Sequence, residues 1–393
     1  MSFVDEFIEF TRHEESPENF WRWAAYATIA ATLRDSVYYD HGLRKTYPNI
    51  YVVFLAQSAN NRKSGPFNLV YNLLQHQAIA NTKIIRGRTS VQAILDELSQ
   101  DVGSKNGGMP LKGGSCLLAA EELSSFFVND PQLIPMLTDM YDFREHWEYK
   151  LRSTGSMKIK NLCVTLLAAS NEQLLKEVYT DAAIYGGLLG RTFMVRPDAT
   201  RPPNAQMDVD PNAYKTDNLV KSLKEIKNQM RGPIKMAPEA KDFYVMWYDK
   251  LYQSYKRYND KTGMIQRIHT GVVKLSIILA AADCQMVISQ AHVEEAIKQA
   301  TSLKTNYDGF VLKSGKSEQA QSGALLLEML KERKGSVSRK EFLMLHWNDV
   351  SSEELDKVVI TFESAGMLTQ VMLNNEISYH WTGKLKNILL KED

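Results

Sequence analysis

A lysine and a serine, Lys63 and Ser64, stand where a strand-like run of residues gives way to a helix-like one. The run before them, 50–55, is apolar and rich in β-branched and aromatic residues, which is typical of a buried parallel strand. The run after them, 67–76, repeats its apolar residues at helical spacing. In a phosphate-binding loop this order puts a lysine on the nucleotide phosphates and a hydroxyl on Mg²⁺. We therefore expect Lys63 and Ser64 to form such a site.

The loop between these runs departs from the glycine-rich pattern G-x-x-x-x-G-K-[ST]. Gln57 stands at the first glycine position and Arg62 at the second. Glycine suits these positions because the backbone approaches phosphate closely or takes a positive φ there. We count Gln57 and Arg62 among the candidate nucleotide-binding residues, while an ordinary turn between strand and helix remains the alternative interpretation.

Two adjacent carboxylates, Glu121 and Glu122, follow another short apolar run, 116–120. At the end of a strand beside a phosphate-binding loop, one carboxylate can hold Mg²⁺ through water and the next can polarise the attacking water. We expect Glu121 in the metal site and Glu122 as the catalytic base. The alternative is that both are acidic residues at the start of a helix over 123–127.

A third apolar run, 162–169, ends at Ser170 and Asn171, where a side chain could sense the terminal phosphate. Further on, a glycine-rich turn precedes Arg191 and a last strand-like run. A guanidinium there could project from the sheet and stabilise charge on a transferring phosphate. We name Asn171 and Arg191 as candidate catalytic residues. A surface ion pair is the alternative for Arg191.

Residues 147–160 alternate between apolar and polar around Ser153–Ser156, which predicts a β-hairpin. Four cationic residues crowd this hairpin and are candidate contacts for DNA phosphates: Lys150, Arg152, Lys158 and Lys160. Exposed lysines on a hairpin also serve solubility and protect sheet edges. Because the chain as a whole carries a formal charge of only +1, a local cluster is more informative than it would be in a basic protein.

The composition is that of a globular protein with a large core. The 393 residues leave room for two or three domains, and the three cysteines lie far apart in apolar runs. We expect buried, reduced thiols and a cytoplasmic protein without a membrane span or signal peptide. The histidines show no metal-ligand spacing, so we expect no histidine-based metal site.

The elements that must position these residues change in character along the chain. A helical segment, 1–48, comes first. We expect its aromatic residues Phe20, Trp21 and Trp23 to belong to the core, because they alternate with alanine at helical spacing. Strands alternating with helices over 49–200 predict an α/β fold with a parallel sheet. We expect a helical region over 201–315, starting with a Pro-rich linker. Three helices and a two-stranded ribbon over 321–393 predict a winged helix, a fold that serves DNA binding and protein contacts alike.

Taken together, residues 17–312 resemble the ATPase domain of phage- and plasmid-borne replicative helicases, which are AAA+ enzymes similar to the minichromosome-maintenance helicases. The order and spacing of several short segments carry the resemblance: Pro48–Tyr51, Lys63–Ser64, Glu121–Glu122, Ser170–Asn171, Gly190–Phe193, Val273–Ser276 and 291–297. The resemblance implies a P-loop AAA+ core with a helical lid over 201–315, and it implies ATP and Mg²⁺ as cofactors.

The resemblance also assigns expected roles. Asn171 would be the first sensor, Arg191 a finger that reaches a neighbouring subunit's nucleotide, and Arg267 or Lys274 a second sensor. The 147–160 hairpin would correspond to a pore hairpin that grips DNA. The expectation is an ATP-driven helicase or translocase of a phage or mobile element. It would act as a ring, expected to be a hexamer, on single-stranded or forked DNA with other replication proteins. A non-hydrolysing nucleotide-binding scaffold and a winged-helix transcription regulator are the alternatives.

Overall fold

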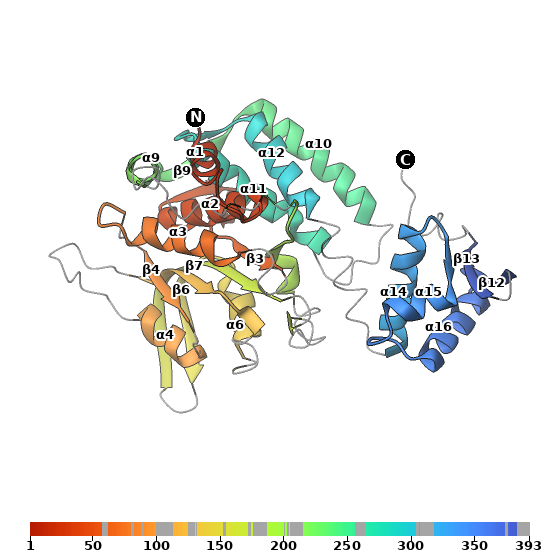
Figure 1. Ribbon diagram of the computed structural model, residues 1–393. Helices are drawn as coiled ribbons and strands as arrows, with labels where there is room; N and C mark the ends of the chain where they lie inside the picture. Colours follow the sequence, from red (N-terminus) through yellow and green to blue (C-terminus); the bar gives the residue numbers. More distant parts are fainter. Residues whose placement is uncertain are drawn as a thin grey trace. The chain divides into compact units, whose positions relative to one another are not determined.

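The computed structural model divides into two compact units, Met1–Tyr307 and Asp308–Asp393, each described by itself (Figure 1). The first unit holds the expected segments 1–48 and 49–200 and most of 201–315, and the second holds 321–393. The structure describes residues 1–56, 62–79, 82–87, 90–99, 113–124, 130, 132–151, 155–171, 174–175, 187–199, 201–202, 204, 215–255, 264–303, 306, 318–373 and 376–382.

A mostly parallel sheet forms the centre of the first unit, which confirms the predicted α/β class. Its parallel strands are β3 (Tyr51–Leu55), β4 (Lys83–Arg86), β5 (Ser115–Ala120), β7 (Gly155–Ser170) and β8 (Thr192–Val195). They lie in the order β4-β5-β7-β3-β8. All residues of β3 and β5 are buried, as expected for strands covered on both faces. All five parallel strands therefore end at one edge of the sheet, the carboxyl edge, and begin at the opposite amino edge.

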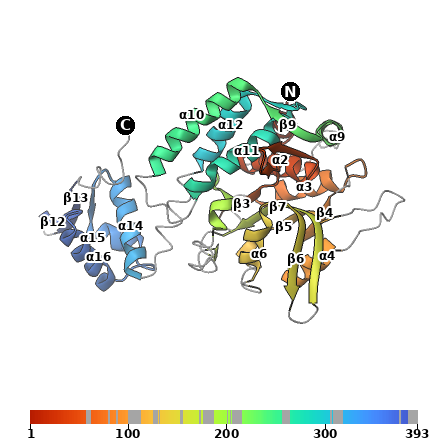
Figure 2. The same ribbon diagram turned by 180° about the vertical axis from the view of Figure 1, so that it is seen from behind.

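Helices cover both faces of this sheet (Figures 1 and 2). On one face, α2 (Glu18–Leu33) and α3 (Ser64–Gln75) pack together, and Phe20 of α2 stacks on Phe54 of β3 with ring centroids 4.5 Å apart. On the other face lie α4 (Val91–Ser99) and α6 (Leu133–Met140), and the Tyr51 hydroxyl donates a hydrogen bond to the Leu137 carbonyl of α6. Since neighbouring positions of a strand point to opposite faces, β3 is anchored from both sides.

The N-terminal aromatics belong to the core, as predicted. Phe20, Trp21 and Trp23 are each 2% exposed or less. Helix α1 (Phe3–Phe10) begins with a capping box between Ser2 and Asp5. Pro17 is the N-cap residue of α2, and the Ser16 hydroxyl donates to the Arg62 carbonyl 2.7 Å away, which joins the start of α2 to the end of the predicted phosphate-binding loop.

The predicted hairpin is present and is longer than expected. Strand β6 (Arg144–Leu151) pairs antiparallel with the first half of β7, and the second half of β7 pairs with β3 and β5. The hairpin arm and the run 162–169 therefore form one strand of 16 residues. Asn161 marks the junction with a φ of 52°, and the Gly114 amide donates to the neighbouring Lys160 carbonyl at 2.6 Å.

The helical region after the sheet consists of α9 (Asp217–Gln229), α10 (Pro238–Tyr255), α11 (Met264–Ala282) and α12 (Gln290–Ser302). It also supplies two strands that the sequence did not predict, β9 (Gly232–Met236) and β10 (Val287–Ile288). These join β1 (Val37–Asp40) and β2 (Lys45–Thr46) in a small sheet of order β10-β9-β1-β2. The helical region is thus tied to the N-terminal segment by backbone pairing.

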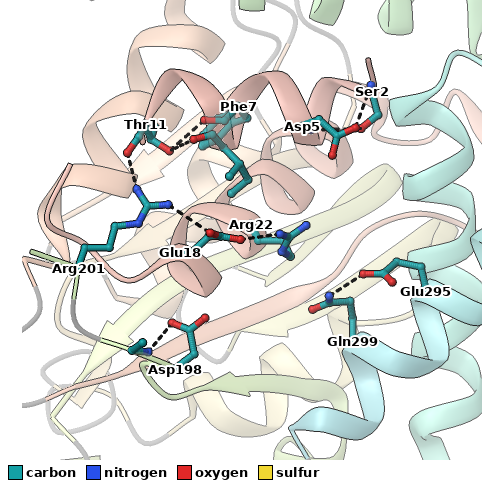
Figure 3. Close-up of polar contacts among 12 residues, drawn as sticks. Ser2, Asp5, Phe7, Thr11, Glu18, Arg22, Asp198, Arg201, Glu295 and Gln299 are labelled. Atoms are coloured by element: carbon teal, nitrogen blue, oxygen red, sulfur yellow. Dashed lines mark hydrogen bonds and ion pairs between the residues drawn. The ribbon is translucent and has the colours of Figure 1, made fainter. Parts of the chain in front are cut away.

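Arg201 fastens the segment after β8 to the N-terminal helices (Figure 3). Its guanidinium donates to the carbonyl of Thr11, and it lies 3.8 Å from the Glu18 carboxylate, which also pairs with Arg22 at 2.7 Å. The start of the expected linker is therefore anchored by polar contacts.

The second unit contains α14 (Glu318–Glu332), α15 (Arg339–Leu345) and α16 (Ser352–Ser364) with a three-stranded antiparallel sheet. Its strands are β11 (Ser336–Ser338), β12 (Leu368–Leu373) and β13 (Glu376–Trp381), in the order β11-β13-β12. The expected ribbon is β12 and β13, and β11 is an additional strand. A separate core, which includes Leu330, Phe342, Leu355 and Tyr379, holds the unit together.

Two predictions from composition concern the whole chain. All three cysteines are free, with Cys116 and Cys163 buried as expected and Cys284 partly exposed. Burial raises the pKa of the Cys116 thiol to about 12, so this thiol is held in its unreactive form at neutral pH. No helix in the described part of the chain is long and apolar enough to cross a membrane.

Candidate functional site

Lys63 lies at the carboxyl edge of the sheet, as a phosphate-binding lysine must. It is the N-cap residue of α3, and its ammonium donates to the Ala56 carbonyl, just beyond β3, at 3.2 Å. Ser64 is the first residue of the helix and is exposed. Helix amides and a cation therefore face outward at the end of a central strand, where open α/β sheets bind anions.

Arg62 adopts the backbone conformation that the motif requires at its second glycine. Its φ is 40°, in the left-handed region that non-glycine residues seldom enter. Its side chain forms an ion pair with Glu15, and its carbonyl accepts from Ser16. These contacts hold the strained backbone in place. Gln57, at the first glycine position, lies outside the described residues.

Glu122 is the carboxylate that the structure brings to this lysine. Its Oε1 accepts hydrogen bonds from the hydroxyls of Ser170 at 2.7 Å and Ser124 at 2.6 Å. Partial burial lowers the pKa of Lys63, and the negative charge of Glu122 acts in the opposite direction. Lys63, Glu122 and Ser170 are far apart in the sequence, but in the fold they belong to one polar cluster at the carboxyl edge.

Glu121 points elsewhere. Its carboxylate is exposed, and its charge adds to burial in raising the pKa of Tyr71, in the second half of α3, to about 12. The guanidinium of Arg86 lies over the same tyrosine ring at 5.1 Å. The described contacts therefore do not join Glu121 to Ser64. From the sequence we expected β5 to lie beside β3. Instead, β7 lies between these two strands.

Ser170 and Asn171 end the strand next to β3, which is the position expected for a phosphate sensor. Ser170 is in register with Leu55, and its hydroxyl reaches both Glu122 and the Asn171 carbonyl. The Asn171 carbonyl also accepts from the Leu175 amide at 2.9 Å. Sequence reasoning missed the part played by Ser170, although a serine that ends a fully apolar strand was the available signal.

Arg191 and Arg267 come together at the opposite, amino edge. Both guanidiniums donate to the carbonyl of Gly187, at 3.0 Å and 3.1 Å respectively. Arg191 immediately precedes Thr192, which pairs with Tyr51 at the beginning of β3. A strand of five residues spans roughly 17 Å. The structure therefore separates Arg191 and Arg267 from Lys63 of the same chain by about the length of β3.

Lys274 is buried at the amino edge, only 2% exposed. Its ammonium donates to the Asn49 backbone carbonyl at 2.8 Å, to the Asn49 side chain at 2.9 Å and to the Tyr141 carbonyl at 3.3 Å. Burial lowers the pKa of Lys274 to about 8, partly offset by Asp142. These bonds lock α11 to the start of β3, and the side chain does not extend toward Lys63.

The hairpin presents its lysines on one face. Lys150, Lys158 and Lys160 are exposed, and the strand register puts Lys158 opposite Glu148 and Lys160 opposite His146. Because alternate residues share a face, all three lysines lie on the same side. The other side carries the buried Trp147 and Ile159. Arg152 lies outside the described residues.

Comparisons of the sequence with models of known protein families and with curated proteins found no match. Among the described residues, no three of the types His, Cys, Asp and Glu gather into a metal-binding cluster. The functional case therefore depends on the geometry of the two sheet edges and of the hairpin.

Proposed function

We propose that the chain is an ATP-driven DNA helicase or translocase of a phage or mobile element that works as a ring. One observation carries the proposal. The Glu122 carboxylate, held by Ser170, lies close enough to Lys63 to affect its pKa at the carboxyl edge of a parallel sheet. A phosphate-binding lysine beside an oriented carboxylate is the arrangement that nucleotide hydrolysis requires.

The residues present suit a nucleoside triphosphate with Mg²⁺. Lys63 and the first amides of α3 would hold its phosphates, and the exposed Ser64 hydroxyl would meet the metal ion. Glu122 would orient the attacking water and accept its proton, while Ser170 keeps the carboxylate in place. Glu121, the sequence-based candidate for the metal site, would have to turn away from Tyr71 to reach an ion bound at Ser64. When bound, the ion neutralises charge on the terminal phosphates.

The position of Arg191 supports a ring. A guanidinium about one strand length away from Lys63 of its own chain does not reach that lysine's nucleotide, which favours an action on a nucleotide bound by an adjacent copy. Arg267 donates to the same Gly187 carbonyl as Arg191 and would act from the same side. The proposed first sensor, Asn171, stays with Lys63 at the carboxyl edge.

The second unit fits a winged helix in the order of its elements. In a helix-turn-helix arrangement α16 would be the recognition helix. Two carboxylates, Glu353 and Glu363, are exposed along it against one exposed lysine, Lys357, while the third, Asp356, forms an ion pair with Arg339. An acidic surface repels DNA phosphates. We propose that this unit contacts protein, which weakens the alternative of a transcription regulator.

A non-hydrolysing nucleotide-binding scaffold is the second candidate function. The ion pair between Arg62 and Glu15, at a position where other loops have glycine, favours it. Isothermal titration with ATP and with a non-hydrolysable analogue tests nucleotide binding, and ATP turnover with and without single-stranded DNA separates the two functions. Binding without turnover would establish the scaffold.

A further inference from the structure

A cavity of about 1030 Å³ opens at the amino edge, away from Lys63. It is bordered by the His41–Thr46 loop, by Tyr141–Glu145, and by α10 and α11. Five cationic side chains that are exposed or partly exposed line it, Arg44, Lys45, Arg144, Arg191 and Arg267, and the buried Lys274 also borders it. Two carboxylates, Asp142 and Glu145, offset them only in part. The excess of positive charge favours an anionic ligand.

Two of the cations lie close together and form a pair that is suited to binding an anion. Arg191 and Arg267 donate to one carbonyl, that of Gly187, although each guanidinium has five N–H donors. Burial and then the charge of Arg191 lower the pKa of Arg267, so the two groups repel each other across the cavity wall. A phosphate oxyanion would relieve this repulsion and match the planar fork of each guanidinium.

Aromatic rings form the remaining walls. Tyr47 and Phe143 stack with their centroids 4.0 Å apart. Across from the loop, Tyr244 stacks on Tyr248 at 6.2 Å, and Tyr248 meets His269 edge-on at 5.3 Å. Phe143, Tyr244 and Tyr248 are partly exposed. Cations alternating with accessible aromatic faces are the combination by which proteins bind single strands, phosphate by charge and base by stacking.

The cavity continues into the hairpin. Arg144 lines the cavity and is also the first residue of β6, and its exposed guanidinium lies 3.6 Å from the Asp139 carboxylate. It shares the strand face that carries Lys150 six residues later, and the paired strand adds Lys158 and Lys160 to that face. Six residues of strand cover roughly 20 Å. From Arg144 to Lys150 this face therefore carries four cationic side chains, together with His146 and one carboxylate, Glu148.

We propose that this cavity is a second nucleic-acid site, which takes the phosphates and bases of a single strand that continues along the lysine face of the hairpin. The inference rests on the proposed function for its ligand, DNA, but it does not need nucleotide hydrolysis. It assigns a binding role to Arg44, Arg144 and Tyr244, none of which belongs to the proposed ATPase site, and it leaves Arg191 and Arg267 to the neighbour's nucleotide, as in the proposed function.

Fluorescence anisotropy with the full chain, labelled dT20 and no nucleotide tests this at several salt concentrations. Arg44→Ala/Arg144→Ala should weaken binding and lower the log–log salt slope by about 1.4, at roughly 0.7 for each lost phosphate contact on a single strand. Arg44→Lys/Arg144→Lys keeps both charges and should retain the slope. Lys221→Ala/Lys241→Ala removes two exposed lysines that do not line the cavity, and it should behave as wild type.

An abasic 20-mer separates stacking from charge. Wild type should bind dT20 at least about fivefold more tightly than the abasic strand, since stacking of one base contributes on the order of 1 kcal/mol or more. Tyr244→Ala should reduce that preference. Equal binding of both strands by wild type would overturn the stacking part of the inference.

The remaining outcomes distinguish this inference from the proposed function. Wild-type protein that binds no single strand at all would overturn both. Unchanged affinity and slope in Arg44→Ala/Arg144→Ala, with a loss only on removal of Lys150, Lys158 and Lys160, would overturn the cavity site alone. A double variant that alters ATP turnover of the assembled protein without altering DNA binding would assign the cavity to a neighbour's nucleotide.

Discussion

Ser170 Oγ lies 2.7 Å from Glu122 Oε1 and donates a hydrogen bond that joins the ends of β7 and β5. Where the two strands pair, their side chains are apolar except for Ser115 and Thr165, so this contact is the polar link between the strands at the carboxyl edge. It orients the carboxylate whose charge acts to raise the pKa of Lys63, although β5 is not adjacent to β3.

Loss of that hydroxyl should impair catalysis and leave binding intact. Ser170→Ala should lower the rate of ATP hydrolysis about tenfold or more, because a hydrogen bond to a charged group contributes roughly 1.5–3 kcal/mol. Its Kd for ATP should not change. Glu122→Gln should stop turnover with nucleotide binding retained, and Asp242→Asn, an exposed carboxylate on α10, serves as the control. If Glu121→Gln has the larger effect on turnover, the catalytic carboxylate has been misassigned.

Arg191 should act between subunits. Arg191→Ala and Lys63→Ala should each be inactive alone, since an arginine finger contributes about 10³–10⁵ in rate in GTPases. Mixed assemblies should recover part of the activity, because some interfaces pair an intact Lys63 with an intact Arg191. The measurement is ATP turnover as a function of mixing ratio, with co-assembly verified by size-exclusion chromatography. Variants that co-assemble without recovery would leave Arg191 with a structural role.

Lys274 should make stability depend on pH above neutrality. Its pKa is lowered from 10.5 to about 8 in the folded chain, so the unfolded chain binds more protons between these values. The penalty of burying the charge is fully present below about pH 8 and is relieved as pH rises toward 10.5. Between pH 7 and 9 the free energy of unfolding of wild type should rise by about 1 kcal/mol relative to Lys274→Met. Urea unfolding at several pH values measures it, with Lys241→Met as an exposed control. Parallel pH profiles would contradict it.

The hairpin should bind single strands through its lysine face. Lys150→Ala/Lys158→Ala/Lys160→Ala should reduce affinity for an oligonucleotide and lower the salt slope by about 2, at roughly 0.7 for each contact. Thermal unfolding should be unchanged, because all three side chains are exposed and the buried Trp147 and Ile159 lie on the other face. A salt slope equal to that of wild type would show that these lysines are ordinary solvated surface residues.

The sequence predicts the sheet well because its strands are local signals. Apolar runs such as 50–55 and 116–120 are buried strands, as expected. Strand β9 was missed because it is short, begins with Gly232-Pro233, and pairs with β1 nearly 200 residues away. Helix α6 was missed because Pro135 suggests a break, although proline is tolerated in a first turn.

The residue types of the site could be predicted from the sequence, but the contacts between those residues could not. Lys63 and Glu122 could be named from spacing, but the order of strands, which puts β7 between them, is a property of the folded sheet. Lys274 and Arg267 lie seven apart on α11, yet one is buried against Asn49 and the other opens into a cavity. Burial on a helix face depends on what packs against it, which no local pattern records.

The most direct test of the ATPase proposal is steady-state ATP turnover by the full chain, with and without single-stranded DNA, for wild type, Lys63→Ala and the control Lys221→Ala. The account predicts turnover that DNA stimulates in wild type and in the control. It predicts a loss of at least about a hundredfold in Lys63→Ala, the scale seen when one charge-stabilising donor is removed from an active site. Wild-type protein that binds ATP and shows no turnover, or turnover that survives in Lys63→Ala, would contradict it.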